Sequence, residues 1–194
     1  MIVALVLAAG AARRFGSQKL LAPVGGEPLI RASVDRVVAA GPERTIVVVA
    51  PDGEGRAIRH ALAGLAVTVV VNPHPERGLS SSLRAGLAAV PANALAVLVT
   101  LGDQPIDRDE ILPALVARFG GDGLPIVAPR YKGVQGLPVL FARAVFPELE
   151  ALAGDRGARS VVERDPARVA YVDFDFPMPP DVDTPGDLAL LAGA

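Results

Sequence analysis

The sequence predicts an α/β fold, in which helices cover both faces of a mostly parallel, partly mixed sheet. Through the first half of the chain, short β-branched runs alternate with longer amphipathic stretches, which is the order that βαβ units require. The runs are almost continuously apolar, as strands are when both faces of their sheet are covered. In the second half, short apolar runs are joined by turns rich in Gly and Pro. Part of the sheet is therefore expected to be antiparallel.

The first half contains four expected strands and four expected helices. The strands are Ile2–Leu7, Thr45–Ala50, Val67–Val71 and Leu95–Thr100. The helices are Leu29–Ala40, Gly55–Gly64, Ser80–Val90 and Asp107–Phe119. Start and stop signals support several of these boundaries: serines that would cap a helix at Ser80–Ser82, Asp107 after a proline, and Gly41 after Ala40.

Three further strands and a last helix are expected in the second half. They are Pro125–Pro129, Pro138–Phe141, Val169–Asp175 and the helix Pro185–Ala192. No internal repeat, linker or low-complexity tract interrupts the 194 residues. This length suits one domain spanning residues 1–194.

Composition excludes several classes of function. The net charge is -2 and aromatic residues make up only 4% of the chain. Neither a basic field nor a base-stacking surface is therefore expected, and no nucleic acid partner. The chain has no cysteine, which excludes disulfides, thiolate zinc sites and a cysteine nucleophile.

The charge pattern near the start of the sequence bears on location. The first arginines follow the apolar run, whereas a signal peptide carries its positive charges before that run. No apolar run approaches the ~18 residues of a transmembrane helix. We therefore expect a cytoplasmic protein with no membrane partner.

The loop after the first expected strand, "LAAGAARRFGSQKLL", is glycine-containing and cationic. Ligands of open parallel sheets bind at the carboxyl ends of strands, where glycines let backbone N–H groups approach an anion and cations balance its charge. The spacing fits neither a Walker A loop nor G-x-G-x-x-G. The loop therefore indicates a polyphosphate site of another kind, with a solvated surface loop as the alternative. Its glycines and cations are Gly10, Gly16, Arg13, Arg14 and Lys19.

Three later segments also place polar groups after strands. In "NPHPERGLSSSLRAGL", Gly78 and Ser80–Ser82 offer donors at a helix N-terminus, or serve only as a cap. In "LGDQP", Asp103 follows an apolar strand as a Mg²⁺ ligand would, or as an ordinary turn residue. Asp183 precedes Thr184–Pro185, where it is a second candidate ligand or a helix cap. The two histidines, His60 and His74, have no partners for a Ser-His-Asp triad and are expected at the surface.

These segments together resemble a known family. "LAAGAARRFGSQKLLAPVGGEPLI" is similar to the signature loop of nucleotidyltransferases that activate small phosphorylated molecules. The "NPHPERGLSSSL", "LGDQP", "GDRGAR" and "DVDTPGDL" segments look like those of molybdenum cofactor cytidylyltransferases. The resemblance spans essentially the whole chain and implies a three-layer α/β/α, Rossmann-like nucleotidyltransferase fold.

The resemblance also implies site residues. The β- and γ-phosphates of the nucleotide would be held by Gly10, Arg14, Gly16 and Lys19, whereas Arg13 is either a further contact or an ordinary surface residue. The base and sugar would be bordered by Leu7, Ala8 and Ala9, and the nucleotide would lie along Asn72, Gly78, Ser80, Ser81 and Ser82. Mg²⁺ would be bound by Asp103 and Asp183, with Asp181 as an alternative. The residues implied to act in catalysis are Arg14, Lys19 and Asp103.

The implied reaction is transfer of a cytidylyl group from CTP to the terminal phosphate of molybdenum-molybdopterin, with release of pyrophosphate. A molybdenum hydroxylase would receive the product. "LAAG" resembles the cytidylyl branch, and the methyl group of Ala9 would reduce room for a purine. Leu137 stands where the family usually has His, which leaves the acceptor open. The alternatives are guanylyl transfer to the same cofactor, a sugar phosphate or other small phosphate as acceptor, and a non-catalytic nucleotide sensor.

Overall fold

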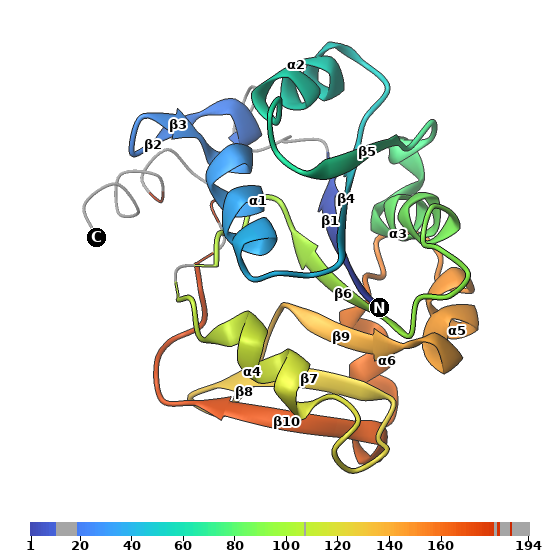
Figure 1. Ribbon diagram of the computed structural model, residues 1–194. Coiled ribbons are helices and arrows are strands. Elements are labelled where there is room, and N and C mark those ends of the chain that lie inside the picture. Colours follow the sequence, from blue (N-terminus) through green and yellow to red (C-terminus); the bar gives the residue numbers. More distant parts are fainter. Residues whose placement is uncertain (11–18, 107, 181, 183–186, 188–194) are drawn as a thin grey trace.

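The protein was analysed as a computed structural model, which describes residues 1–10, 19–106, 108–180, 182 and 187. These residues form an eight-stranded sheet with the order β10-β7-β9-β6-β1-β4-β5, to which β8 is added beside β7 (Figure 1). The first four long strands are β1 (Ile2–Ala8), β4 (Arg44–Val49), β5 (Val67–Val71) and β6 (Ala96–Leu101). The later strands are β7 (Ile126–Tyr131), β8 (Val134–Gln135), β9 (Val139–Ala142) and β10 (Val169–Phe174).

Strand direction confirms the predicted mixed sheet. β1 pairs in parallel with β4 and β6, β4 with β5, and β7 with β10. β9 runs antiparallel to both β6 and β7, so it joins the two parallel parts of the sheet.

Helices cover both faces, so the three-layer prediction is also confirmed (Figure 1). Successive side chains of β1 enter different cores: Leu5 packs with α3, α5 and α6, and Val6 packs with α1, α2 and α4. The first group is α3 (Leu79–Ala88), α5 (Phe146–Glu150) and α6 (Arg159–Arg164). The second group is α1 (Leu29–Ala39), α2 (Gly53–Ala61) and α4 (Ile111–Arg118).

Several short elements have no counterpart in the sequence prediction, α5 and α6 among them. They contain too few residues to show a helical or strand period. The 3-10 turns are η1 (Lys19–Leu21), η2 (Pro75–Arg77), η3 (Arg143–Val145) and η4 (Pro166–Arg168), and a small hairpin is formed by β2 (Pro23–Val24) and β3 (Glu27–Pro28).

Helix starts differ from the prediction at α2, which begins at Gly53 instead of Gly55, and at two further helices. The helix expected from Asp107 begins at Ile111, and Asp107 itself lies outside the described residues. The prediction that Ser80–Ser82 caps a helix was wrong: Gly78 is the N-cap of α3 and no side chain caps it. The serines lie inside the first turn and are buried, so they face the protein instead of the helix end. The last expected helix, 185–192, falls almost entirely outside the described residues.

The ends of the strands are aligned. Ala8 of β1 lies opposite Val49 of β4, and Val49 lies opposite Val71 of β5. On the other side, Leu7 lies opposite Leu101 of β6. The segments after these four parallel strands therefore meet at one edge of the sheet. In the part of the chain that the structure describes, no helix has the length and apolar character needed to cross a membrane.

Candidate functional site

Lys19 and Asp103 form an ion pair at the carboxyl edge of the sheet. The Lys19 Nζ lies 2.7 Å from Oδ2 of Asp103. Lys19 is only 8% exposed, and η1, which carries it, packs against α1 and α2. Burial of an ammonium group is costly unless a charged or polar partner compensates for the lost water, and Asp103 is such a partner. The structure therefore brings together a cation and a carboxylate that the sequence resemblance assigned to nucleotide and metal.

The turn that carries Asp103 is fixed by its neighbours. The Gly102 N–H donates to the carbonyl of Leu7 at 2.9 Å, which ties the end of β6 to the end of β1. A Cβ on Gly102 would lie 2.6 Å from Cδ1 of Ile30, so this position has no room for a side chain. Asp103 is therefore held at a defined height above the sheet.

The C-terminal part of the chain returns to this turn. Gln104 Nε2 donates to the carbonyl of Pro179 at 3.0 Å, and the Val182 N–H donates to the carbonyl of Asp103 at 3.1 Å. Val182 is buried. Its neighbours in the sequence, the candidate metal ligands Asp181 and Asp183, lie outside the described residues. The same is true of Arg13, Arg14 and Gly16 in the first loop.

Asn72 forms the centre of a buried polar cluster after β5. Its Nδ2 donates to Ser81 Oγ at 2.8 Å and to Ser82 Oγ at 3.0 Å, and its Oδ1 accepts from the His74 N–H at 3.0 Å. Ser81 Oγ also lies within hydrogen-bond distance of the carbonyls of His74 and Gly78. These contacts join the end of β5 to the first turn of α3. Asn72, Ser81 and Ser82 thus have structural partners in addition to the nucleotide role expected of them.

Ser80 differs from the two serines that follow it. It is buried, and its Oγ has no hydrogen-bond partner among the described residues. Its backbone N–H donates to the carbonyl of Gly154 at 3.1 Å. Because an unpaired buried hydroxyl is unfavourable, this oxygen is a hydrogen-bonding group available at the start of α3.

Gly78 brings the start of α3 against the loop before α6. Its φ of 86° and ψ of -177° are essentially restricted to glycine. A Cβ at Gly78 would lie 2.5 Å from Oδ1 of Asp155 and 2.6 Å from the carbonyl of Gly154. One at Gly157 would lie 2.7 Å from Leu79 Cδ2. The "NPHPERGLSSSL" and "GDRGAR" segments, distant in sequence, therefore meet at the same edge of the sheet.

A cavity of about 280 Å³ lies between these segments and the Asp103 turn. Its lining includes Gln104, which follows Asp103, and Leu137, which lies shortly before β9. Most of this wall could not be identified from the sequence, because a pocket lining assembled from six separate segments has no local pattern. The lining residues are Leu7, Leu79, Val99, Leu101, Gln104, Gly136, Leu137, Gly157, Ala158, Arg159 and Met178.

The residues at the end of β1 have different surroundings. Leu7 lines the cavity, whereas Ala8 and Ala9 are buried at 4% exposure in the two cores. Gly10 is exposed, and a Cβ there would have no neighbour within 4 Å. The methyl group of Ala9 therefore packs inside the protein. The packing does not support the expectation that this methyl group reduces the room for a purine base.

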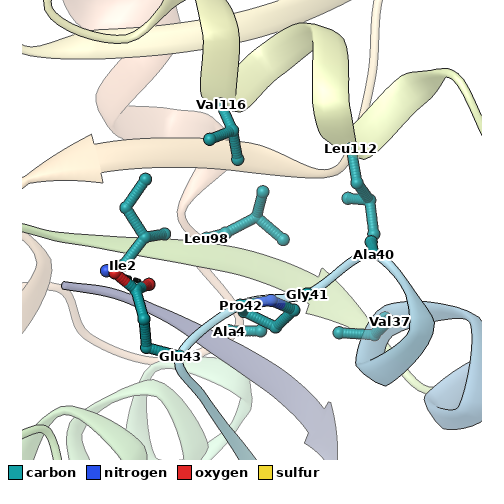
Figure 2. A pocket seen from close by; sticks show the side chains of 10 residues that line it. All are labelled: Ile2, Ala4, Val37, Ala40, Gly41, Pro42, Glu43, Leu98, Leu112 and Val116. Atoms are coloured by element: carbon teal, nitrogen blue, oxygen red, sulfur yellow. Dashed lines mark hydrogen bonds between the residues drawn. The ribbon is translucent and has the colours of Figure 1, made fainter.

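A second cavity, of about 200 Å³, lies at the opposite edge of the sheet, where β1 and β6 begin (Figure 2). It is lined largely by apolar side chains such as Val37, Leu98 and Val116. Among the described residues of its lining, Glu43 alone carries a charge, and Glu43 accepts a 2.7 Å hydrogen bond from the Ile2 N–H. Lacking a cation and the strand-end loops, this cavity is a poorer phosphate site than the carboxyl edge.

Comparison with protein families assigns the chain. Residues 4–169 match the MobA-like NTP transferase domain. A molybdenum cofactor guanylyltransferase of Rhodobacter capsulatus is 31% identical, with 97% of this chain and 93% of that protein covered. Other relatives are longer: the bifunctional protein GlmU of Halorhodospira halophila is 34% identical over 66% of this chain, but the match covers 26% of GlmU.

Solved structures agree with this assignment. The crystal structure of Rv0371c from Mycobacterium tuberculosis has a TM-score of 0.88 and 34% identity, covering 100% of this chain and 97% of that one. Its complex with manganese has a TM-score of 0.83 and 31% identity, covering 100% and 98% of the two chains. The family match and the fold agree, and the chain belongs to the MobA-like NTP transferase family of nucleotidyltransferases.

Proposed function

We propose that the protein is a single-domain, cytoplasmic enzyme that transfers a cytidylyl group from CTP to the terminal phosphate of molybdenum-molybdopterin. The observation that carries the proposal is the Lys19–Asp103 pair, held at the carboxyl edge of the sheet beside a cavity of about 280 Å³. An oxygen of the acceptor phosphate forms a bond to the α-phosphorus of CTP. The bond from that phosphorus to the bridging oxygen breaks, and pyrophosphate leaves with the electron pair.

The donor set at Asp103 fits a divalent cation. Mg²⁺ binds one or two protein carboxylates and completes its shell with phosphate oxygens and water. The ion pair with Lys19 uses Oδ2 of Asp103, and the same carboxylate has a second oxygen to offer. Asp103 and Asp183 would hold the ion, and its chemistry there would be to stabilise charge on the phosphoryl oxygens. The manganese complex of the related Rv0371c supports a divalent ion.

The protein's own groups would act by position and charge. Lys19 neutralises the charge that develops on pyrophosphate, with Arg14 and the glycines Gly10 and Gly16 completing the phosphate loop. The Asp103 turn fixes the distance between phosphates and cavity, which aligns the acceptor with the α-phosphorus. The acceptor phosphate is already an anion near neutral pH, so this arrangement requires no strong general base.

GTP is the second candidate nucleotide. The relatives from Rhodobacter capsulatus and Pyrococcus horikoshii, the latter described as probable, are molybdenum cofactor guanylyltransferases. The "LAAG" segment favours CTP by resemblance. In either case the product would be a molybdopterin dinucleotide for a molybdenum hydroxylase.

The test is a matrix of nucleotides and acceptors. The protein is incubated with Mg²⁺, each of the four NTPs, and either molybdenum-molybdopterin or glucose 1-phosphate, and pyrophosphate is measured. We expect release with CTP and the molybdenum cofactor. A preference for GTP would show that the enzyme transfers a guanylyl group instead of a cytidylyl group. A preference for glucose 1-phosphate would show that the acceptor is a sugar phosphate. Binding of NTP without release of pyrophosphate would indicate a nucleotide sensor.

A further inference from the structure

The cavity beside Asp103 is lined mainly by apolar side chains. Six of the described residues that line it are leucine, valine or methionine: Leu7, Leu79, Val99, Leu101, Leu137 and Met178. Two polar side chains also line it, and each makes one hydrogen bond within the protein. Gln104 Nε2 donates to the carbonyl of Pro179, and Arg159 Nε donates to Glu163 at 2.8 Å. The rest of the side-chain wall offers a ligand only apolar contact.

Leu137 is presented to this cavity by a tightly held turn. Tyr131 Oη donates to the carbonyl of Leu137 at 2.8 Å. A Cβ on the preceding residue, Gly136, would lie 2.7 Å from the sulfur of Met178 and 2.8 Å from the ring of Tyr131. The Gly136 N–H donates to the carbonyl of Pro129 at 3.2 Å. Because its backbone is anchored on both sides, the Leu137 side chain has a fixed place in the wall.

We infer that Leu137 determines acceptor specificity, and that the cavity accepts an uncharged ring or branched apolar group joined closely to the acceptor's phosphate. The inference rests on the proposed function, because the acceptor's phosphate would attack an NTP bound at the Lys19–Asp103 pair, and the residue after Asp103 lines the cavity. Each sugar hydroxyl facing the leucine, valine and methionine side chains of this wall loses water without gaining a partner, which costs about 1–3 kcal/mol. A flat heterocycle buries its faces against Leu137 and Met178 without that loss. The site therefore rejects polyhydroxylated phosphates.

The experiment measures binding, so it does not depend on turnover. Calorimetry with Mg²⁺ compares phenyl phosphate with glucose 1-phosphate, each with and without α,β-methylene CTP, which releases no pyrophosphate. We expect phenyl phosphate to bind at least about tenfold more tightly. Leu137→Asn should remove most of this preference, whereas Leu137→Met should retain it. Leu95→Asn is the matched control, because Leu95 is 62% exposed and at the other end of β6.

Each outcome has one meaning for the inference. Equal or reversed affinities of the two esters, or no binding of phenyl phosphate, would overturn it. So would an unchanged preference in a Leu137→Asn protein that melts like the wild type and binds the CTP analogue normally. If Leu137→Asn does not fold, Met178→Gln replaces it, because Met178 lines the same wall. The proposed function fails separately, when no NTP releases pyrophosphate with the molybdenum cofactor.

Discussion

The Lys19 ammonium group lies 2.7 Å from the Asp103 carboxylate, although the two residues come from different loops at the sheet edge. The pair places a positive charge suited to phosphates directly beside a carboxylate suited to a metal ion. Nucleotidyl transfer requires both, because the leaving pyrophosphate and the α-phosphoryl group each need charge stabilisation.

Replacing Asp103 should abolish catalysis. Asp103→Ala removes a metal ligand, so we expect kcat to fall by at least about 100-fold in the pyrophosphate assay, as when other electrostatic groups of active sites are removed. Asp109→Asn is the control, because Asp109 forms an exposed pair with Arg36 and neither residue lines the cavity beside Asp103. Near-normal turnover of Asp103→Ala would remove Asp103 from the site.

Replacing Lys19 should impair use of the nucleotide. Lys19→Met keeps the length and buried stem of the side chain but removes its charge. We expect kcat/KM for the nucleotide to fall by about 10- to 100-fold, with either KM raised or kcat lowered. Steady-state kinetics at several Mg²⁺ concentrations give the result, and unchanged kinetics would show that Lys19 serves only to neutralise Asp103.

Ser81 and Ser80 should respond differently to removal of their hydroxyl groups. Ser81→Ala removes the hydroxyl that accepts from Asn72 and lies within hydrogen-bond distance of the His74 and Gly78 carbonyls, so we expect a loss of about 1 kcal/mol in the free energy of unfolding. Ser80→Ala removes an oxygen with no partner among the described residues, so stability should be unchanged or slightly raised. Urea denaturation measures both. If the Ser80 hydroxyl binds nucleotide, Ser80→Ala should also weaken NTP binding, and unchanged affinity would exclude that role.

Gly78 should tolerate no side chain. Gly78→Ala combines an unfavourable φ of 86° with contacts of 2.5–2.6 Å to Asp155 and Gly154, so we expect destabilisation by more than about 2 kcal/mol. Gly64 is the matched control: its φ is also 86°, but a Cβ there would meet nothing within 4 Å. Gly64→Ala should cost only about 1 kcal/mol. Equal losses in thermal denaturation would contradict the close approach of α3 and the 154–155 loop.

Glu148 should make stability depend on pH in the acid range. Two hydrogen bonds from Arg168, at 2.7 and 3.1 Å, hold the pKa of the Glu148 carboxyl below its usual value. A lowered folded-state pKa gives stability above the ordinary glutamate pKa, and this stability is lost as pH falls through the lowered value. Glu148→Gln should therefore cost about 0.5–1 kcal/mol at neutral pH and nothing near pH ~2.

The control for this pH effect is Glu163→Gln. Glu163 forms a more exposed pair with Arg159 within one helix, which should contribute less than about 0.5 kcal/mol. A Glu148→Gln deficit that persists undiminished at low pH would show that the loss comes from packing and not from charge.

Elements with a clear apolar pattern were predicted from the sequence more accurately than very short elements. The strand Ile2–Ala8 and the helix Leu29–Ala39 were predicted to within one residue, because long apolar patterns reflect burial directly. The helices Phe146–Glu150 and Arg159–Arg164 were missed, because one or two turns carry no period. Ser80–Ser82 was misassigned as a cap, because sequence alone does not show that Asn72 binds two of these hydroxyls.

The site was predictable where chemistry is local. Lys19 and Asp103 each lie in a distinctive strand-end segment, so the sequence identified both without showing that they touch. The apolar cavity could not be predicted, because Leu79, Leu137 and Met178 belong to segments that only the folded chain brings together.

The most direct test of the account is a crystal structure with α,β-methylene CTP and Mg²⁺. We expect the triphosphate to contact Lys19 Nζ, and the ion to be ligated by Asp103 and Asp183 and by a phosphate oxygen. A triphosphate bound away from Lys19, or an ion that Asp103 does not ligate, would contradict the central claim.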